Sequence, residues 1–186
     1  AFYNVENLFD CNDDANDDTE FLPQGKREWT EERYQQKLNN LAHVLGDIAD
    51  KGGAVVGLAE VENRHVLEDL VRNPSIRKRN YSIIHYDSPD PRGVDCALLY
   101  DAKIFHPKSS GVRFIALPEE SKIPTRDILF ATGTIDNELF HFIVGHWPSR
   151  YGGDPASAGR RMVAAQTMRQ VADSLLREYP GSKAIL

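Results

Sequence analysis

Short apolar segments recur along the whole chain, and most are bounded by turn residues, which is typical of strands. Two of them, "DILFATGTI" and "LFHFIVGHW", are joined at "DNE", and this pattern predicts a hairpin. In the opening segment "AFYNVENLF" the apolar positions alternate until a loop begins. The predicted strands are residues 1–9, 54–59, 81–86, 96–101, 127–135, 139–147 and 183–186.

Three stretches have apolar residues at helical spacing instead. Thr30 precedes Glu31 and Glu32, which predicts an N-cap with acids in the first turn of a helix that ends near the Gly52-Gly53 pair. A shorter helix is predicted from Arg64 to Val71. A long amphipathic helix is predicted from Ala158 to Tyr179, with these apolar residues on one face: Ala164, Met168, Val171, Leu175 and Leu176.

The order of these elements is mixed, because strands and helices alternate at first and successive strands follow. This order predicts an α/β or α+β fold in which helices pack outside one sheet or a pair of sheets. Residues 10–29 are rich in Asp and Asn and show no periodicity, so we expect a solvated acidic loop. The 186 residues suffice for one domain.

Charge and composition narrow the classes of function. The formal net charge is -6, which argues against a protein that holds nucleic acid mainly through a strongly basic face. A phosphate-bearing substrate stays compatible with this charge, because a bound divalent cation supplies positive charge locally. The two cysteines are too few for a disulfide framework, and no apolar run is long enough to span a membrane.

Glu60 follows a buried strand, where the loops of an α/β sheet carry side chains toward ligands. A carboxylate there suits a hard metal ion, although a surface acid is the simpler interpretation of Glu60 alone. Asn4 lies among alternating apolar residues and would orient a metal-bound water or a carboxylate, or satisfy a turn. Neither residue decides the function by itself.

A second group of polar residues surrounds two later strands. His146 ends an apolar strand and is followed by Ser149 and Arg150, all three of which are natural phosphate contacts. Arg92 and Asp95 precede the strand "CALLYD": Arg92 suits a phosphate fork, and Asp95 could anchor an Arg or a His. The competing interpretations are an ordinary loop His and a surface ion pair.

Five other residues rank lower as candidates for chemistry. Glu62 is interpreted as an acid at a helix N-terminus, and Cys96 as packed rather than nucleophilic. The remaining histidines are expected to be solvated or structural: His43, His65 and His141.

Four segments, "FYNVENLFD", "VVGLAEVEN", "RGVDCALLYD" and "IVGHWPSR", occur in this order, and together they resemble the endonuclease/exonuclease/phosphatase superfamily, which has the DNase I-like fold. The stretch "FLPQGKREWTEERYQQKLNNLAHVL" is similar to its bacterial branch. The resemblance covers essentially the whole chain. It implies a single domain over residues 1–186 with a four-layer α/β sandwich, two sheets with outer helices.

The resemblance also implies roles at the matching positions. Glu60 corresponds to the glutamate that binds the divalent cation, Mg²⁺ or Mn²⁺, and Asn4 to the asparagine that helps to arrange the metal and the nucleophile. His146 corresponds to the histidine that contacts the scissile phosphate. Arg92 is similar to the arginine at the phosphate-binding edge, and Asp95 is expected to support the catalytic residues.

Two motifs of the family do not occur in this sequence. One is Gly-Asp-x-Asn after the strand that follows the long helix, and the other is a late Asp-His pair. We therefore expect a domain that is incomplete at its C-terminal end and clipped at its N-terminal end. It should be nearly inactive alone, because one positioned acid or base contributes ~10²–10⁴-fold.

The expected activity is divalent-metal-dependent hydrolysis of phosphate esters, foremost as a nuclease-like phosphodiesterase. The alternatives are a phosphomonoesterase or a lipid or inositol phosphatase of the same fold, and a non-catalytic binding module. The expected partner is a phosphate-ester substrate, with nucleic acid among the options, and the sequence predicts no oligomeric state. Bacterial relatives are often exported, so we expect a secreted or periplasmic protein, although no leader is visible.

Overall fold

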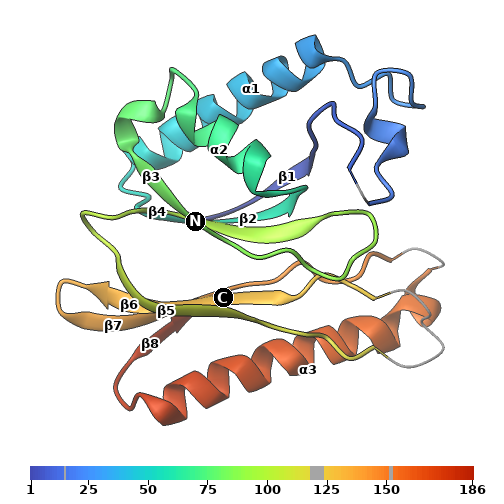
Figure 1. Ribbon diagram of the computed structural model, residues 1–186. Helices are drawn as coiled ribbons and strands as arrows, with labels where there is room; N and C mark the ends of the chain where they lie inside the picture. Colours follow the sequence, from blue (N-terminus) through green and yellow to red (C-terminus); the bar gives the residue numbers. More distant parts are fainter. Residues whose placement is uncertain (15, 118–123, 151–152) are drawn as a thin grey trace.

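The computed structural model describes residues 1–14, 16–117, 124–150 and 153–186. Two four-stranded sheets lie face to face between helices (Figure 1). The first sheet has the order β1-β2-β4-β3, and the second has the order β5-β6-β7-β8. The strands are β1 (Phe2–Leu8), β2 (Val55–Val61), β3 (Tyr81–His85), β4 (Asp95–Asp101), β5 (His106–Arg113), β6 (Ile128–Ile135), β7 (Glu138–Val144) and β8 (Lys183–Ile185).

Both sheets are mixed. β1 pairs parallel with β2, and β7 pairs parallel with β8, while the other neighbouring strands are antiparallel. The predicted hairpin is confirmed, since β6 and β7 are joined by Asp136 and Asn137. Both turn residues have positive φ angles, 48° and 67°, as a two-residue turn that matches the strand twist requires.

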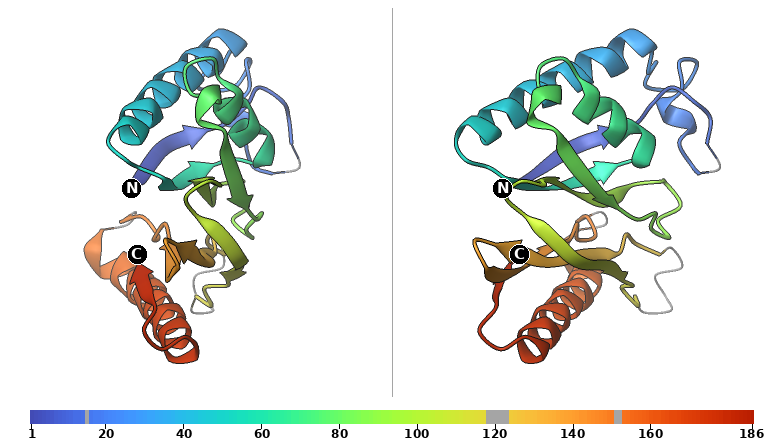
Figure 2. Two further views of the ribbon diagram at one scale, coloured as in Figure 1. Left: turned by 90° about the vertical axis from the view of Figure 1, so that its left-hand side faces the viewer. Right: turned by 60° about the vertical axis from the view of Figure 1, so that its left-hand side comes forward.

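Three apolar cores separate four layers, which confirms the predicted class of two sheets with outer helices (Figure 2). The first core lies between the first sheet and the helices α1 (Glu31–Asp50) and α2 (Arg64–Arg72). The second lies between the two sheets and includes Phe105 and Leu98. The third lies between the second sheet and α3 (Asp154–Glu178).

Local chemistry explains where the first two helices begin. The Thr30 side chain accepts a hydrogen bond from the Arg33 backbone N–H, so the predicted N-cap of α1 is confirmed. The Asn63 side chain caps α2 in the same way, by accepting from the Val66 backbone N–H. No helix within the described residues is long and apolar enough to cross a bilayer.

Three expectations from the sequence need correction. β5 was not predicted, because "HPKSSGVR" is a largely exposed edge strand without apolar alternation. α3 begins at Asp154 rather than at Ala158. The acidic loop is not simply solvated: Asp10 and Asp18 are buried, and a 3₁₀-helix occupies Thr19–Phe21.

Candidate active site

Two irregular strand segments determine the direction of the Asn4 and Glu60 side chains. The pairing of β1 with β2 shifts register between Asn4 and Leu8, and the pairing of β2 with β4 shifts between Ala59 and Val61. Glu60 lies at the second irregularity with φ 67°, in the left-handed region. Bulges of this kind re-aim side chains beside functional sites. Glu60 is therefore inside β2, at its bulge, and not beyond the strand as the sequence pattern indicates.

Asn4, Glu60 and His146 meet at one end of the two sheets. The Asn4 amide donates from Nδ2 to Glu60 Oε1 at 3.1 Å, and its Oδ1 accepts from the Glu6 backbone N–H at 2.8 Å. His146, which follows β7 in the second sheet, has its Nε2 3.3 Å from the same Glu60 oxygen. Three predicted residues from distant parts of the sequence thus form one cluster.

Two further residues join this cluster, and the sequence analysis missed both. Arg126 precedes β6, is 5% exposed, and donates from Nε to His146 Nδ1 at 3.1 Å. Asp90, in the loop between β3 and β4, accepts from Nη1 of Arg126 at 3.1 Å. Nothing in "PTRDIL" or "DSPDPRG" marks these residues as functional. The signal is their burial as charged groups, which only the fold reveals.

The imidazole of His146 is held neutral. Burial and the adjacent Arg126 guanidinium lower the pKa of His146 to about 4, although the Glu60 carboxylate opposes this shift. At neutral pH the ring therefore carries one N–H and one lone pair. Such a ring can donate one hydrogen bond to an anion without bringing a charge of its own.

The predicted phosphate contacts lie beside the cluster. The Arg92 side chain is 54% exposed and forms a fork on Asp90, with Nε and Nη2 at 3.0 and 2.8 Å from its two oxygens. Arg92, Arg126 and Ser149 line one groove of about 420 Å³. Arg150 is exposed, and its carbonyl accepts from the Gly153 N–H. The structure thus brings Arg92 and Ser149 to one groove next to His146.

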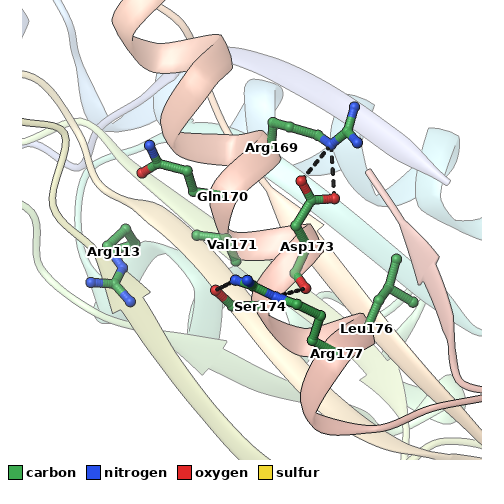
Figure 3. A pocket seen from close by; sticks show the side chains of 8 residues that line it. All are labelled: Arg113, Arg169, Gln170, Val171, Asp173, Ser174, Leu176 and Arg177. Carbon is green, nitrogen blue, oxygen red and sulfur yellow. Dashed lines mark hydrogen bonds and ion pairs between the residues drawn. The ribbon is translucent and has the colours of Figure 1, made fainter.

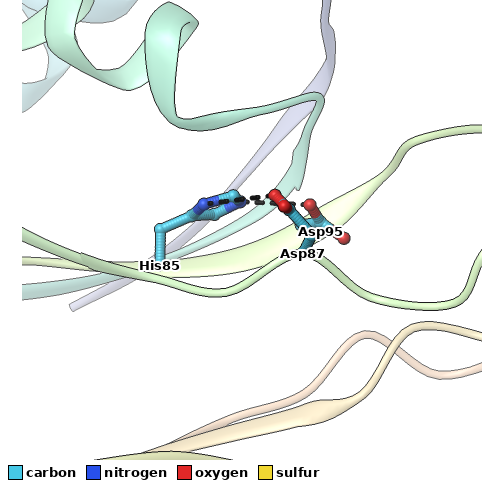
Figure 4. Close-up of side chains that lie close together, drawn as sticks. All are labelled: His85, Asp87 and Asp95. Carbon is cyan, nitrogen blue, oxygen red and sulfur yellow. Dashed lines mark hydrogen bonds and ion pairs between the residues drawn. The ribbon is translucent and has the colours of Figure 1, made fainter. Parts of the chain in front are cut away.

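Asp95 lies against a histidine, one of the two partner types that the sequence allows, and this histidine is His85. Asp95 Oδ2 lies 3.1 Å from His85 Nε2 (Figure 4). Its Oδ1 accepts from the Ser88 backbone N–H. Both Asp95 and the His85 ring are almost fully buried. Within the described residues, Asp95 makes no hydrogen bond to Arg92 or His146. The structure therefore gives Asp95 a place in a buried His–Asp pair.

Glu62 differs from its expected place. It is 3% exposed and accepts from the Asp10 backbone N–H at 2.9 Å, so it ties the acidic loop to the end of β2. Burial raises the pKa of Glu62 to about 8. Cys96 is buried as predicted, and burial raises the pKa of its thiol to about 12.

Another hollow, of about 620 Å³, lies along α3 beside β5 (Figure 3). One ion pair lies in it, with Arg169 Nε 2.8 Å from both oxygens of Asp173, and Arg177 donates to the Asp173 backbone carbonyl. It contains none of the predicted site residues. The cluster around Glu60 is the better candidate for chemistry.

The donor set at Glu60 fits a hard divalent cation. One oxygen of Glu60 contacts Asn4 and His146, while the other makes no hydrogen bond among the described residues. The side chain is 19% exposed, so solvent reaches it. A single carboxylate with room for water is how Mg²⁺ is commonly held, whereas a closed zinc site needs more His or Cys ligands.

The fold and the site together define a two-sheet α+β protein with a carboxylate, an imidazole and arginines at one end of the sandwich. The model of the endonuclease/exonuclease/phosphatase family matches residues 1–186. The chain belongs to this family, whose name describes enzymes that cleave phosphate esters. No curated protein sequence gives a match.

Solved structures with the same fold are similar to the chain at low identity. TDP2 from Caenorhabditis elegans matches with a TM-score of 0.58 and 17% identity over 82% of this chain. ANGEL2, a 2',3'-cyclic phosphatase, matches with 0.59 and 14% over 84%. An endonuclease/exonuclease/phosphatase from Bacteroides vulgatus matches with 0.51 and 15% over 75%. The matches cover 41%, 42% and 52% of those chains, respectively.

Proposed function

We propose that the protein hydrolyses phosphate esters with a divalent cation, Mg²⁺ or Mn²⁺, held by Glu60. One observation carries this proposal: Asn4, Glu60 and His146 converge within 3.1 to 3.3 Å from both sheets of a phosphoesterase fold. The half-exposed Arg92 guanidinium beside them, held in place by Asp90, supports it.

Each side chain has a distinct task in this proposal. Glu60 would hold the cation through Oε2, which makes no hydrogen bond among the described residues, and Asn4 keeps Oε1 in place. When bound, the cation would neutralise charge on the phosphate and lower the pKa of a bound water. The Nε2–H of His146 would donate to a non-bridging phosphate oxygen.

Arg92 would bind the substrate from the other side. Asp90 holds Nε and Nη2 of Arg92, Nη1 makes no hydrogen bond among the described residues and would donate to the phosphate, and Ser149 shares this groove. Because the imidazole is neutral, the positive charge for the phosphate must come from the cation and from Arg92. We propose a phosphodiester as the substrate, and a phosphomonoester is the alternative that the assay distinguishes.

The test compares hydrolysis of bis-p-nitrophenyl phosphate and p-nitrophenyl phosphate with Mg²⁺, Mn²⁺ or EDTA. It uses the purified 186-residue chain and the longest encoded product that contains it. The proposal expects metal-dependent turnover of the diester by the longer product, and a loss of at least roughly 10²-fold in Glu60→Gln.

The 186-residue chain should be far slower, because its sequence contains neither Gly-Asp-x-Asn nor an Asp-His pair. Equal turnover by the 186-residue chain would contradict a role for those motifs. Turnover that persists in EDTA or in Glu60→Gln would refute the metal role. A product with no hydrolytic activity that still binds phosphate esters would favour the binding-module alternative.

A further inference from the structure

A continuous chain of hydrogen bonds joins the β3–β4 loop to the end of β7. Asp90 is 4% exposed, and it accepts from Arg92 through both of its oxygens and from Arg126 through Oδ2. Arg126 in turn donates from Nε to His146 Nδ1 at 3.1 Å, and its Nη2 lies 2.8 Å from the same atom. One buried carboxylate thus holds two arginines, and one of these arginines holds His146.

This arrangement decides which ring nitrogen carries the proton. A guanidinium has donors only, so the nitrogen that faces it must offer a lone pair. Arg126 Nη2 also lies 3.3 Å from His146 Nε2, but the two shorter contacts both go to Nδ1. In a neutral imidazole the proton is then on Nε2, the nitrogen that faces Glu60.

We propose that Arg126 and Asp90 are positioning residues: Arg126 fixes the proton of His146 on Nε2, and Asp90 holds Arg126 for this purpose. The inference rests on the proposed function, in which this Nε2–H donates to the phosphate. Asp90 also orients Arg92. One carboxylate thus aligns two proposed phosphate contacts, Arg92 directly and His146 through Arg126.

The Arg126–Asp90 ion pair is buried, so it holds the Arg126 side chain firmly in place. The side chains of Arg126 and Asp90 are 6% and 2% exposed, so water competes little for their hydrogen bonds. Removing Asp90 leaves the buried Arg126 charge without its carboxylate partner, whereas removing Arg126 leaves Asp90 paired with Arg92. Arg126 should therefore lose its alignment in an Asp90 variant, even though it is itself unchanged.

The rival role for Arg126 is direct contact with the substrate, since it lines the same groove as Arg92. The two roles predict different results. Positioning acts in the free protein, before any substrate binds. If Arg126 only contacts the substrate, its removal should leave the tautomer of His146 unchanged and weaken substrate binding instead.

The first test is long-range ¹⁵N–¹H NMR of the histidine side chains in the purified 186-residue chain, without metal or substrate. We expect the His146 proton on Nε2 in the wild type. We expect a mixture of both tautomers in Arg126→Gln and in Asp90→Asn, and a predominance of Nε2–H in Arg126→Lys. His141, which is fully buried between Thr132 and Ser182, is the internal control for the fold.

The second test measures kcat and KM in the longest active product. Arg126→Gln should lower kcat by roughly 10–100-fold with little change in KM, as substitutions of groups that orient a site residue commonly do. Arg126→Lys should recover part of the loss. Arg113→Gln, an exposed arginine on β5, is the matched control and should have no effect.

Two results would overturn the inference. One is a wild-type His146 with its proton on Nδ1, which needs no variant to fold. The other is an unchanged tautomer in Arg126→Gln with an unchanged His141 signal. Neither result depends on turnover, so failure here is distinguishable from failure of the proposed phosphoesterase function.

Discussion

Glu60 has a backbone conformation that residues other than glycine rarely adopt, with φ at 67°. Holding a non-glycine residue there costs about 1–2 kcal/mol. Glu60→Gly should therefore have a free energy of unfolding about 1 kcal/mol higher than Glu60→Ala, measured by urea denaturation. Both variants remove the carboxylate, so only the Cβ differs. At ordinary strand positions an Ala variant is more stable than a Gly variant. If Glu60→Ala proved more stable than Glu60→Gly, the result would contradict backbone strain at the bulge.

His141 is fully buried between Thr132 and Ser182, and burial lowers its pKa below 6.5. The unfolded chain therefore binds a proton at this residue before the folded chain does. Stability should fall as the pH drops below about 6.5, by at most about 1.4 kcal/mol per pH unit.

The control is His141→Gln, which keeps a polar group and removes the titration. The difference in unfolding free energy between wild type and His141→Gln should depend on pH below 6.5 and be constant above 7.5 or so. A difference that is constant throughout would show that His141 titrates normally in the folded chain.

Single residues show clearly where sequence reasoning reaches its limit. Asn4, Glu60 and His146 could be found because family motifs surround them, and the structure brings all three together. Arg126 and Asp90 could not, because the role that we propose for them depends on a contact between residues 36 positions apart in sequence. Asp95 is the first residue of β4 rather than a residue before it, and its partner His85 lies on the neighbouring strand β3, whose pairing the sequence does not show.

At the level of elements, the two sheets approach closely at Gly57 of β2. A Cβ there would lie 2.9 Å from Cγ2 of Val144 on β7. Gly57→Ala should therefore lower the free energy of unfolding by about 1–3 kcal/mol through overpacking. The double variant Gly57→Ala/Val144→Ala has a shorter side chain opposite position 57. It should therefore lose less free energy of unfolding than the sum of the losses in the two single variants. Strict additivity of the two substitutions would contradict contact between the sheets at this point.

Gly159 in α3 is the matched control for this substitution. A Cβ at this position meets no atom within 4 Å, and the residue lies inside a helix. Gly159→Ala should raise the free energy of unfolding by about 0.5–1 kcal/mol, the usual difference in helix propensity. A thermal melt of both glycine variants would show shifts in opposite directions.

The elements that the sequence predicted well share one physical property, which is a buried apolar face. The interior strands and all three helices have this property, and they were found with small errors at their ends. β5 is an exposed edge strand that contains Pro107 and carries polar side chains, so no pattern marks it. The irregularities between Asn4 and Leu8 and at Glu60 arise from pairing between strands, which local sequence does not encode.

For the molecule as a whole, the class of two sheets with outer helices followed from the resemblance rather than from periodicity. Periodicity alone left open whether there is one sheet or a pair. The structure decides this through its three separate cores. The bacterial branch, export from the cell and the identity of the metal stay predictions.

The central claim is that Glu60 holds a divalent cation beside His146, and titration with Mn²⁺ tests it most directly. Mn²⁺ is paramagnetic, so it broadens the NMR signals of nearby nuclei. We predict that Mn²⁺ broadens the side-chain signals of His146 and not those of His141, and that Glu60→Gln abolishes this effect. Equal broadening of His146 in wild type and Glu60→Gln, or none in either, would contradict the claim.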